Sequence, residues 1–279
     1  MKPLFIFRHI ACNKTGFLCR YLQERRIPYE LTCIGPGQRL DCDLDKTSGL
    51  IFLGAPHSAN GTEQWISDEI DLIQRAAAVN MPVMGVCFGA QLITRALGGE
   101  VLASGQTQIG WHPVRITEQG RVLMSRAGLP PVFHVFEWHE EAFSLPAGAI
   151  PLFCDDNTHS QGFLEGNILA MQFHLEVTEE IIEDSLIRFA ECLPSANFCI
   201  QSSEQIRRDI PLHLASMHRV AERIYGWWLD KCLVPSLANG PVLAVASETR
   251  DNSPLIIDNS DQIDESSSKT VPLCRVDER

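Results

Sequence analysis

Hydrophobic residues recur in two patterns along the first part of the chain. Short apolar runs are typical of buried strands, and they cover residues 4–7, 29–34, 50–53 and 83–86. Between them, stretches with apolar residues three and four positions apart indicate amphipathic helices at residues 15–26 and 65–79. Strands that alternate with helices form βαβ units. The pattern therefore predicts an α/β fold with a mostly parallel central sheet and helices on both faces.

The pattern changes after residue 100. Shorter apolar runs joined by turn residues predict a meander that leaves and rejoins the main sheet, with strands at residues 101–103, 110–116 and 132–136. A hairpin is predicted to follow at residues 161–163 and 168–173. Thr178 is then expected to cap a helix that ends near Cys192.

The region after Pro194 has a different organisation. Residues 202–232 have a helical pattern, and Pro211 predicts a break into two helices. From about residue 248 the chain is rich in Ser and Asp and poor in large apolar side chains, which is typical of a disordered tail. We therefore expect a main domain at residues 1–193, a helical extension at 194–239 and an acidic tail at 240–279.

Cys87 stands between the 83–86 strand and a run of good helix formers, with Gly85 and Gly89 two residues to either side. This G-x-C-x-G frame is the nucleophile-elbow arrangement, with Cys in place of Ser. Glycines allow strand and helix to crowd a strained residue, and a helix N-terminus favours the thiolate. A free Cys is more often a small buried apolar residue. The frame around Cys87 nevertheless favours a nucleophile.

A Cys nucleophile needs a base, and the base needs a group that orients it. His174 ends the 168–173 strand, and Glu176 follows two residues later. On an extended backbone these two side chains point the same way, so Glu176 can bind the far imidazole nitrogen. The residues predict a Cys87–His174–Glu176 triad. His139, which has acidic neighbours, is the alternative base.

Acyl transfer also requires N–H donors that face the developing oxyanion. Phe88 can supply one from the start of the helix after Cys87. Ala55 can supply another from the Gly54-Ala55-Pro56 loop that follows the 50–53 strand. An ordinary structural turn is the alternative explanation of that loop.

Composition narrows the class of partner. The 279 residues carry a formal charge of −12, with an isoelectric point near 5.2. Nucleic acids and anionic membranes bind basic surfaces, so we expect neither as a partner. The sequence has no Cys-x-x-Cys spacing, so no metal site is predicted. A chain of this length requires no disulfides despite its ten cysteines, and we expect it in a reducing cytoplasm.

Several segments together resemble the class I (triad-type) glutamine amidotransferases, and most closely their stand-alone branch that is similar to GMP synthase. Two motifs are highly specific, namely residues 85–91 (GVCFGAQ) and 172–176 (QFHLE). Supporting matches occur at residues 54–59 (GAPHSA), 108–111 (QIGW), 138–146 (WHEEAFSLP) and 161–163 (QGF). The resemblance covers residues 1–192.

The resemblance implies a flavodoxin-like amidotransferase domain that hydrolyses the γ-amide of glutamine. Cys87 would form a γ-glutamyl thioester, and His174 would protonate the departing ammonia. It assigns substrate contacts to Gly54, Gln91, Gly110 and Trp111, and it implies no cofactor. The sequence shows no synthase domain, so ammonia would pass to a separate synthase or simply be released.

Four departures from the family pattern leave the substrate open, and they are Ala55, Gln108, Glu140 and Leu175. One alternative is a γ-glutamyl peptidase, which would form the same thioester from a γ-glutamyl peptide or a conjugate such as glutathione. A pocket open beyond the γ-amide nitrogen would favour it. A second alternative is an inactive binding or regulatory protein on the same fold. The presence of all three triad residues counts against that alternative.

Overall fold

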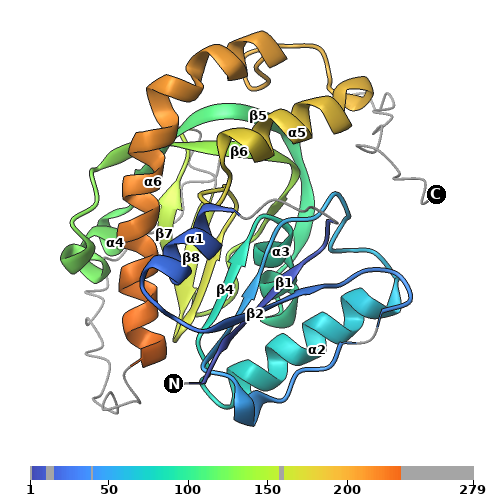
Figure 1. The fold of residues 1–279 in the computed structure, drawn as a ribbon, viewed down its shortest axis with the longest axis vertical. Coiled ribbons are helices and arrows are strands. Elements are labelled where there is room, and N and C mark those ends of the chain that lie inside the picture. Colours follow the sequence, from blue (N-terminus) through green and yellow to red (C-terminus); the bar gives the residue numbers. More distant parts are fainter. Residues whose placement is uncertain (1, 11–15, 39, 157–159, 234–279) are drawn as a thin grey trace, which may run out of the picture.

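The structure, a computed structural model, describes residues 2–10, 16–38, 40–156 and 160–233, and a single sheet runs through its centre (Figure 1). Within these residues the sheet has nine strands in the order β2-β1-β3-β4-β9-β8-β7-β5-β6. The strands are β1 (Leu4–Arg8), β2 (Tyr29–Cys33), β3 (Gly49–Phe52), β4 (Val83–Val86), β5 (Val101–Ile116), β6 (Val132–Phe143), β7 (Ile150–Cys154), β8 (Ser160–Glu165) and β9 (Ile168–Met171).

The two halves of the sheet differ in strand direction. From β2 through β1, β3 and β4 to β9, the pairings are parallel. From β9 through β8, β7 and β5 to β6, they are antiparallel, and this half holds the two longest strands. The prediction of a mostly parallel sheet is therefore wrong, whereas the α/β class is confirmed. Crossover helices separate only the early strands, and strands joined by short connections pair antiparallel.

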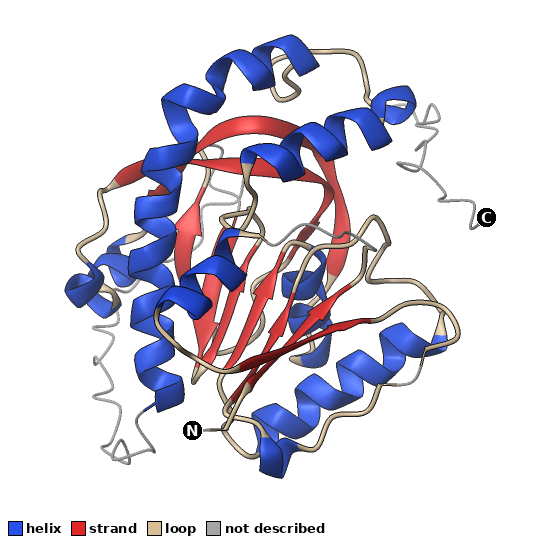
Figure 2. Ribbon diagram, viewed as in Figure 1, coloured by secondary structure: helices blue, strands red, loops and turns tan. Residues whose placement is uncertain are grey.

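β5 and β6 replace the three short strands predicted for the meander, and both arch over the remaining strands (Figure 2). They pair from Val101 opposite Phe143 to Arg115 opposite Val132. A register shift between Ala103 and Gln108 interrupts the ladder without ending β5. The turn residues in this interval therefore mark a bulge, and not the end of a strand. β7 was not predicted.

Helices cover both faces of the sheet, as predicted (Figure 2). One face packs against α1 (Phe17–Glu24), α5 (Glu179–Arg188) and α6 (Ser203–Leu233), and the other against α2 (Gln64–Ala78) and α3 (Phe88–Ala96). In β3, Ile51 contributes to the first core and Leu50 and Phe52 to the second. Burial on both faces explains why the strand runs are continuously apolar. The short α4 (Glu118–Leu123) follows β5.

α6 is one helix of 31 residues, although Pro211 predicted two helices. Pro211 has no N–H and removes one backbone hydrogen bond, and Figure 1 shows the helix changing direction along its length. Tertiary contacts hold the helix, since the Tyr21 hydroxyl of α1 donates to the Glu222 carbonyl at 3.0 Å. The helical extension at 194–239 as a separate unit stays a prediction. The predicted tail at 240–279 lies outside the described residues.

Cysteine chemistry departs from expectation at one position. Seven cysteines of the described residues are free thiols, but Cys192 is disulfide-bonded. The expectation of a chain without disulfides is therefore wrong at Cys192.

Across the described residues, every helix is too short or too polar to serve as a bilayer span.

Candidate active site

Three segments that are distant in sequence meet at the carboxyl ends of β3, β4 and β9, which are neighbouring parallel strands. Gly54 follows β3, Cys87 follows β4, and His174 lies three residues beyond β9. The Cys87 N–H donates to the carbonyl of Met171, the last residue of β9, at 2.8 Å. The topology thus brings the predicted groups together at the carboxyl ends of the strands, where α/β folds bind ligands.

Cys87 occupies a strained turn between β4 and α3. Its φ of 51° and ψ of −110° lie outside the regions that residues with a Cβ normally adopt. A Cβ on Gly89 would lie 2.1 Å from the Phe52 carbonyl oxygen, and one on Gly85 would lie 2.5 Å from the Gly89 carbonyl oxygen. Only glycine allows α3 to approach β3 and β4 this closely. The two glycines therefore make the elbow possible.

His174 and Glu176 form the predicted pair. His174 Nδ1 lies 2.6 Å from Glu176 Oε1, and the Leu175 N–H donates to Glu176 Oε2 at 3.0 Å. The His174 N–H donates to the Phe136 carbonyl of β6 at 2.8 Å. With Nδ1 bound to the carboxylate, the Nε2 atom is the one left to act on a substrate.

The electrostatics of His174 favour the imidazolium. Burial lowers the pKa of this imidazole, but the Glu176 carboxylate opposes burial, as do the charge and hydrogen bond of Cys87. Together they raise the pKa of His174 well above its usual value.

Two helices fix the backbone behind Glu176. The Phe17 N–H of α1 donates to the Glu176 carbonyl at 2.7 Å. His218 of α6 lies with Nε2 2.8 Å from the Val177 carbonyl, so Nε2 carries the hydrogen, and its ring stacks on Phe17 at 3.8 Å. No motif in the sequence identifies His218, because α6 lies beyond the segments that carry the resemblance.

His139, the alternative base, is placed elsewhere. It is buried, with Nε2 3.2 Å from Glu137 Oε2 and Nδ1 3.0 Å from the Glu141 carbonyl. Nδ1 is thus hydrogen-bonded within β6, whereas the buried Nε2 lies near Glu137 without forming a hydrogen bond. His139 does not line the cavity beside Cys87. The geometry favours His174 as the base.

A cavity of about 230 Å³ opens beside Cys87, and Gly54, Ala55, His174 and Glu176 line it. Ala55 is not among the described non-glycine residues with positive φ, so its Cβ causes no backbone strain there. Phe88 does not line the cavity, and its buried ring packs edge-on against His9. Its N–H belongs to the first turn of α3, where N–H groups have no helical partner.

Two further contacts involve backbone carbonyls of β6. The Cys87 thiol lies 3.8 Å from the Trp138 carbonyl, and the buried Gln91 donates from Nε2 to the Glu141 carbonyl at 3.2 Å. Gln91 is one helical turn from Cys87, which brings it to the same end of α3. Sequence reasoning missed Trp138 as a neighbour of the thiol, because a backbone contact leaves no residue pattern.

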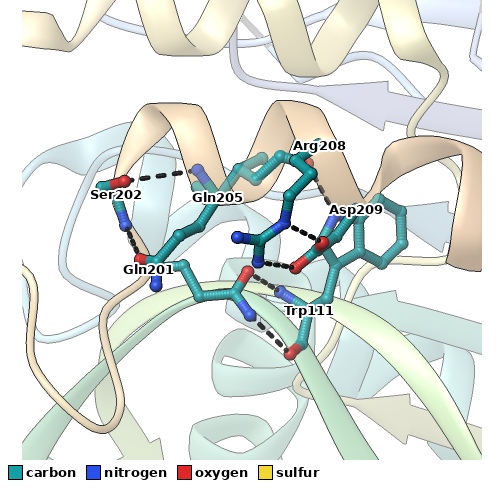
Figure 3. Close-up of polar contacts among 7 residues, drawn as sticks. Trp111, Gln201, Ser202, Gln205, Arg208 and Asp209 are labelled. Atoms are coloured by element: carbon teal, nitrogen blue, oxygen red, sulfur yellow. Dashed lines mark hydrogen bonds and ion pairs between the residues drawn. The ribbon is translucent and has the colours of Figure 1, made fainter.

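The structure does not bring Gly110 and Trp111 to the cavity. The Trp111 N–H donates to Gln201 Oε1 at 2.9 Å, and Gln201 Nε2 donates to the Trp111 carbonyl at 3.3 Å (Figure 3). The backbone groups that the resemblance assigns to substrate are thus paired with a side chain of this chain. Substrate binding by Gly110 and Trp111 stays a prediction.

The segment before α6 is fixed to β5. Ile109 donates to the Cys199 carbonyl at 3.0 Å, and Gln201 donates to the Ile109 carbonyl at 2.9 Å. Ser202 and Gln205 then form a reciprocal capping box at the start of α6, with bonds of 2.7 and 3.2 Å (Figure 3). This anchored start directs α6 toward α1 and the segment after His174.

Known proteins match this chain over much of its length. The model of the family "Glutamine amidotransferase class-I" matches residues 13–190. This chain belongs to the class I glutamine amidotransferases. The matched region contains Cys87, His174 and Glu176, and it ends before α6 begins.

Curated relatives of this amidotransferase differ in their named activities. The glutamine amidotransferase-like protein YfeJ of Salmonella typhimurium is 28% identical over 183 residues, covering 63% of this chain and 76% of the relative. Gamma-glutamyl peptidase 3 of Arabidopsis thaliana is 30% identical over 146 residues, covering 50% and 59%. A subunit of the glutamine-hydrolysing GMP synthase of Sulfolobus acidocaldarius is 30% identical over 159 residues, covering 55% and 81%.

Solved structures share the fold. A glutamine amidotransferase from Methylobacillus flagellatus superimposes with a TM-score of 0.78 at 27% identity, covering 87% of this chain and all of that one. One from Thermotoga maritima has a TM-score of 0.68 at 22% identity, covering 83% and 97%. The predicted resemblance to the amidotransferases is confirmed.

Proposed function

We propose that this amidotransferase is a Cys-dependent hydrolase of γ-glutamyl amides, which cleaves L-glutamine to glutamate and ammonia. The observation that carries the proposal is that Cys87, His174 and Glu176 converge at the carboxyl ends of the strands, beside a cavity. Membership of the class I family supports glutamine as the substrate.

In the proposed reaction, the Cys87 thiolate attacks the γ-carbonyl carbon, and the N–H groups of Ala55 and Phe88 stabilise the oxyanion. The C–N bond breaks as the leaving nitrogen takes a proton from His174. Water then attacks the thioester and gives a proton to His174, and the C–S bond breaks to release glutamate. Glu176 holds the imidazole with Nε2 toward the reacting atoms. Gly54 and Gln91 are proposed to contact the substrate, and the scheme requires no cofactor.

The fate of ammonia depends on a partner. One named relative is a GMP synthase component that forms only part of its enzyme, which supports transfer of ammonia from this chain to a separate synthase. Release into the cytoplasm is the alternative for a free-standing glutaminase.

A γ-glutamyl peptidase is the second candidate, and a specific observation favours it. The cavity continues past His174 and Glu176 to α5, which leaves room for a leaving group larger than ammonia. The γ-glutamyl peptidases among the relatives support the same interpretation.

Product release from the purified protein tests these proposals. L-glutamine and a γ-glutamyl dipeptide are supplied in parallel, with Cys87→Ala as the control. Glutamate and ammonia from glutamine would support the glutaminase, and cleavage of the dipeptide alone would support the peptidase. If neither substrate is cleaved but a glutamine-like electrophile labels Cys87, the result would indicate an amidotransferase that needs its partner. If neither substrate is cleaved and Cys87 is not labelled, the result would contradict the proposal.

A further inference from the structure

The cavity extends from Cys87 toward α5 and also toward β1 and β2, where Arg8 and Leu31 line it. Beyond His174 and Glu176 its wall passes to Val177 and then along α5. Gln91, the proposed substrate contact on α3, is not among its lining residues. One part of the open space therefore lies on the His174 side of the nucleophile.

This direction has a chemical meaning. At the reacting carbon of a γ-glutamyl amide, the glutamyl carbons and the amide nitrogen point in different directions. His174 must reach the nitrogen to protonate it as the C–N bond breaks. Any substituent on that nitrogen therefore lies on the His174 side, where the cavity continues. Ammonia would leave this space unused.

The continuation has apolar walls. Ile181 and Phe189 contribute to its lining at the α5 end. Both side chains are partly exposed, so their apolar surface is accessible to a ligand. The Phe189 ring packs edge-on against Trp138, with 5.9 Å between centroids.

The charged residues at the α5 end of the cavity include an ion pair. Asp184 and Arg188, one turn apart on α5, both line the cavity and lie 3.3 Å from each other. Neighbouring opposite charges leave the apolar side chains to determine which substituent is preferred.

We propose that Ile181 and Phe189 form the apolar wall of a leaving-group subsite, which binds the apolar side chain of an amino acid joined through its α-nitrogen to the γ-glutamyl group. The inference rests on the proposed function, because it requires the Cys87 thioester. The bonds formed and broken are the same as with glutamine, except that the leaving group is an amino acid whose nitrogen takes the proton from His174.

Two dipeptides of similar size test the subsite. γ-Glu-Leu and γ-Glu-Asn have nearly isosteric side chains that differ in polarity. Burial of a leucine side chain predicts that kcat/KM is about tenfold or more higher for γ-Glu-Leu. Competition between the two substrates measures the ratio directly, and L-glutamine is assayed beside them.

A pair of variants on α5 assigns the preference to the cavity. Ile181→Asn should reduce the ratio to about threefold or less while glutamine hydrolysis is retained. Ile187→Asn is the matched control, because Ile187 is 71% exposed and does not line the cavity, and it should leave the ratio unchanged. If Ile181→Asn does not fold, Phe189→Ala provides the same comparison.

Cleavage of γ-Glu-Leu no faster than γ-Glu-Asn, including no cleavage of either, would overturn the subsite. A ratio that falls equally in Ile187→Asn would do the same. Neither result affects the proposed function while glutamine is hydrolysed or Cys87 is labelled. Loss of both of those would overturn the proposed function itself.

Discussion

The two sides of the candidate site are built by different physical means. Cys87 is positioned locally, by one strand, one turn and one helix that two glycines allow to crowd together. The His174–Glu176 pair is positioned from a distance, by hydrogen bonds from β6, α1 and α6 to the backbone around it.

This contrast separates sterics from hydrogen bonding. The elbow depends on the absence of two Cβ atoms, so damage there should appear mainly as lost stability. The acid–base pair depends on the direction of a few hydrogen bonds, so damage there should appear mainly as lost turnover and a changed pH profile.

The largest effect is expected from the nucleophile itself. Cys87→Ala should reduce glutamate release by about a thousandfold or more, because no thioester can form. Cys87→Ser should perform little better, since its hydroxyl is not ionised near neutral pH. Thermal unfolding should show both variants folded. Activity near wild type in Cys87→Ala would show that another residue is the nucleophile.

Gly89→Ala should test the steric basis of the elbow. The added Cβ would lie 2.1 Å from a backbone oxygen of β3, which cannot rotate away. We expect a loss of about 3 kcal/mol or more in the free energy of unfolding, measured by denaturant titration. Gly35→Ala is the control, because a Cβ there meets nothing within 4 Å. Equal effects of the two changes would refute a steric elbow.

Glu176→Gln should test the electrostatic side. The carboxylate raises the pKa of His174, so its loss lowers that pKa and the imidazole loses its proton at lower pH. The leaving nitrogen needs that proton, so the alkaline limb of the kcat profile should move to lower pH. At its optimum the variant should lose about a hundredfold in kcat/KM, less than His174→Ala.

The His174–Glu176 pair should also make the stability of the folded protein depend on pH in a predictable direction. The pKa of His174 is higher in the folded protein than the value of 6.5 for an unfolded imidazole. The stabilisation by its ion pair with Glu176 is therefore fully present below pH 6.5 and is lost as the pH rises through the folded pKa. Melting temperatures between pH 6 and 9 should therefore converge for wild type and Glu176→Gln as pH rises. Divergence would contradict the assigned ion pair.

The smallest effect is expected from the distant support. His218→Ala removes the bond to Val177 and the stack on Phe17, and we expect kcat to fall by about tenfold with KM unchanged. His218→Gln retains a donor and should recover part of the loss. The control is His213→Ala, because His213 stacks on His134 of β6 and not on the triad segment. An equal loss of kcat in His213→Ala would show that α6 acts through stability alone.

The same contrast explains what the sequence could predict. Cys87 and the Glu176 spacing were predictable because a turn between two glycines and an i, i+2 pair on an extended chain are local properties. The antiparallel pairing of β8 with β9 was also predictable, because turn residues mark that hairpin. The parallel pairing of β9 with β4 was not, because a local pattern does not identify a strand neighbour that is distant in sequence. Trp138 acts through its carbonyl, and His218 through a contact 41 residues away, so neither has a local signature.

The long-range bond between Tyr21 and Glu222 has a consequence for biosynthesis. It spans 201 residues, and the His218 contact also waits for α6, which is the last helix of the described chain to leave the ribosome. The glycine contacts that shape the elbow involve only β3, β4 and α3, which are synthesised much earlier. A nascent chain therefore acquires its thiol-bearing turn first, and the groups that activate the thiol are braced only when the final helix docks.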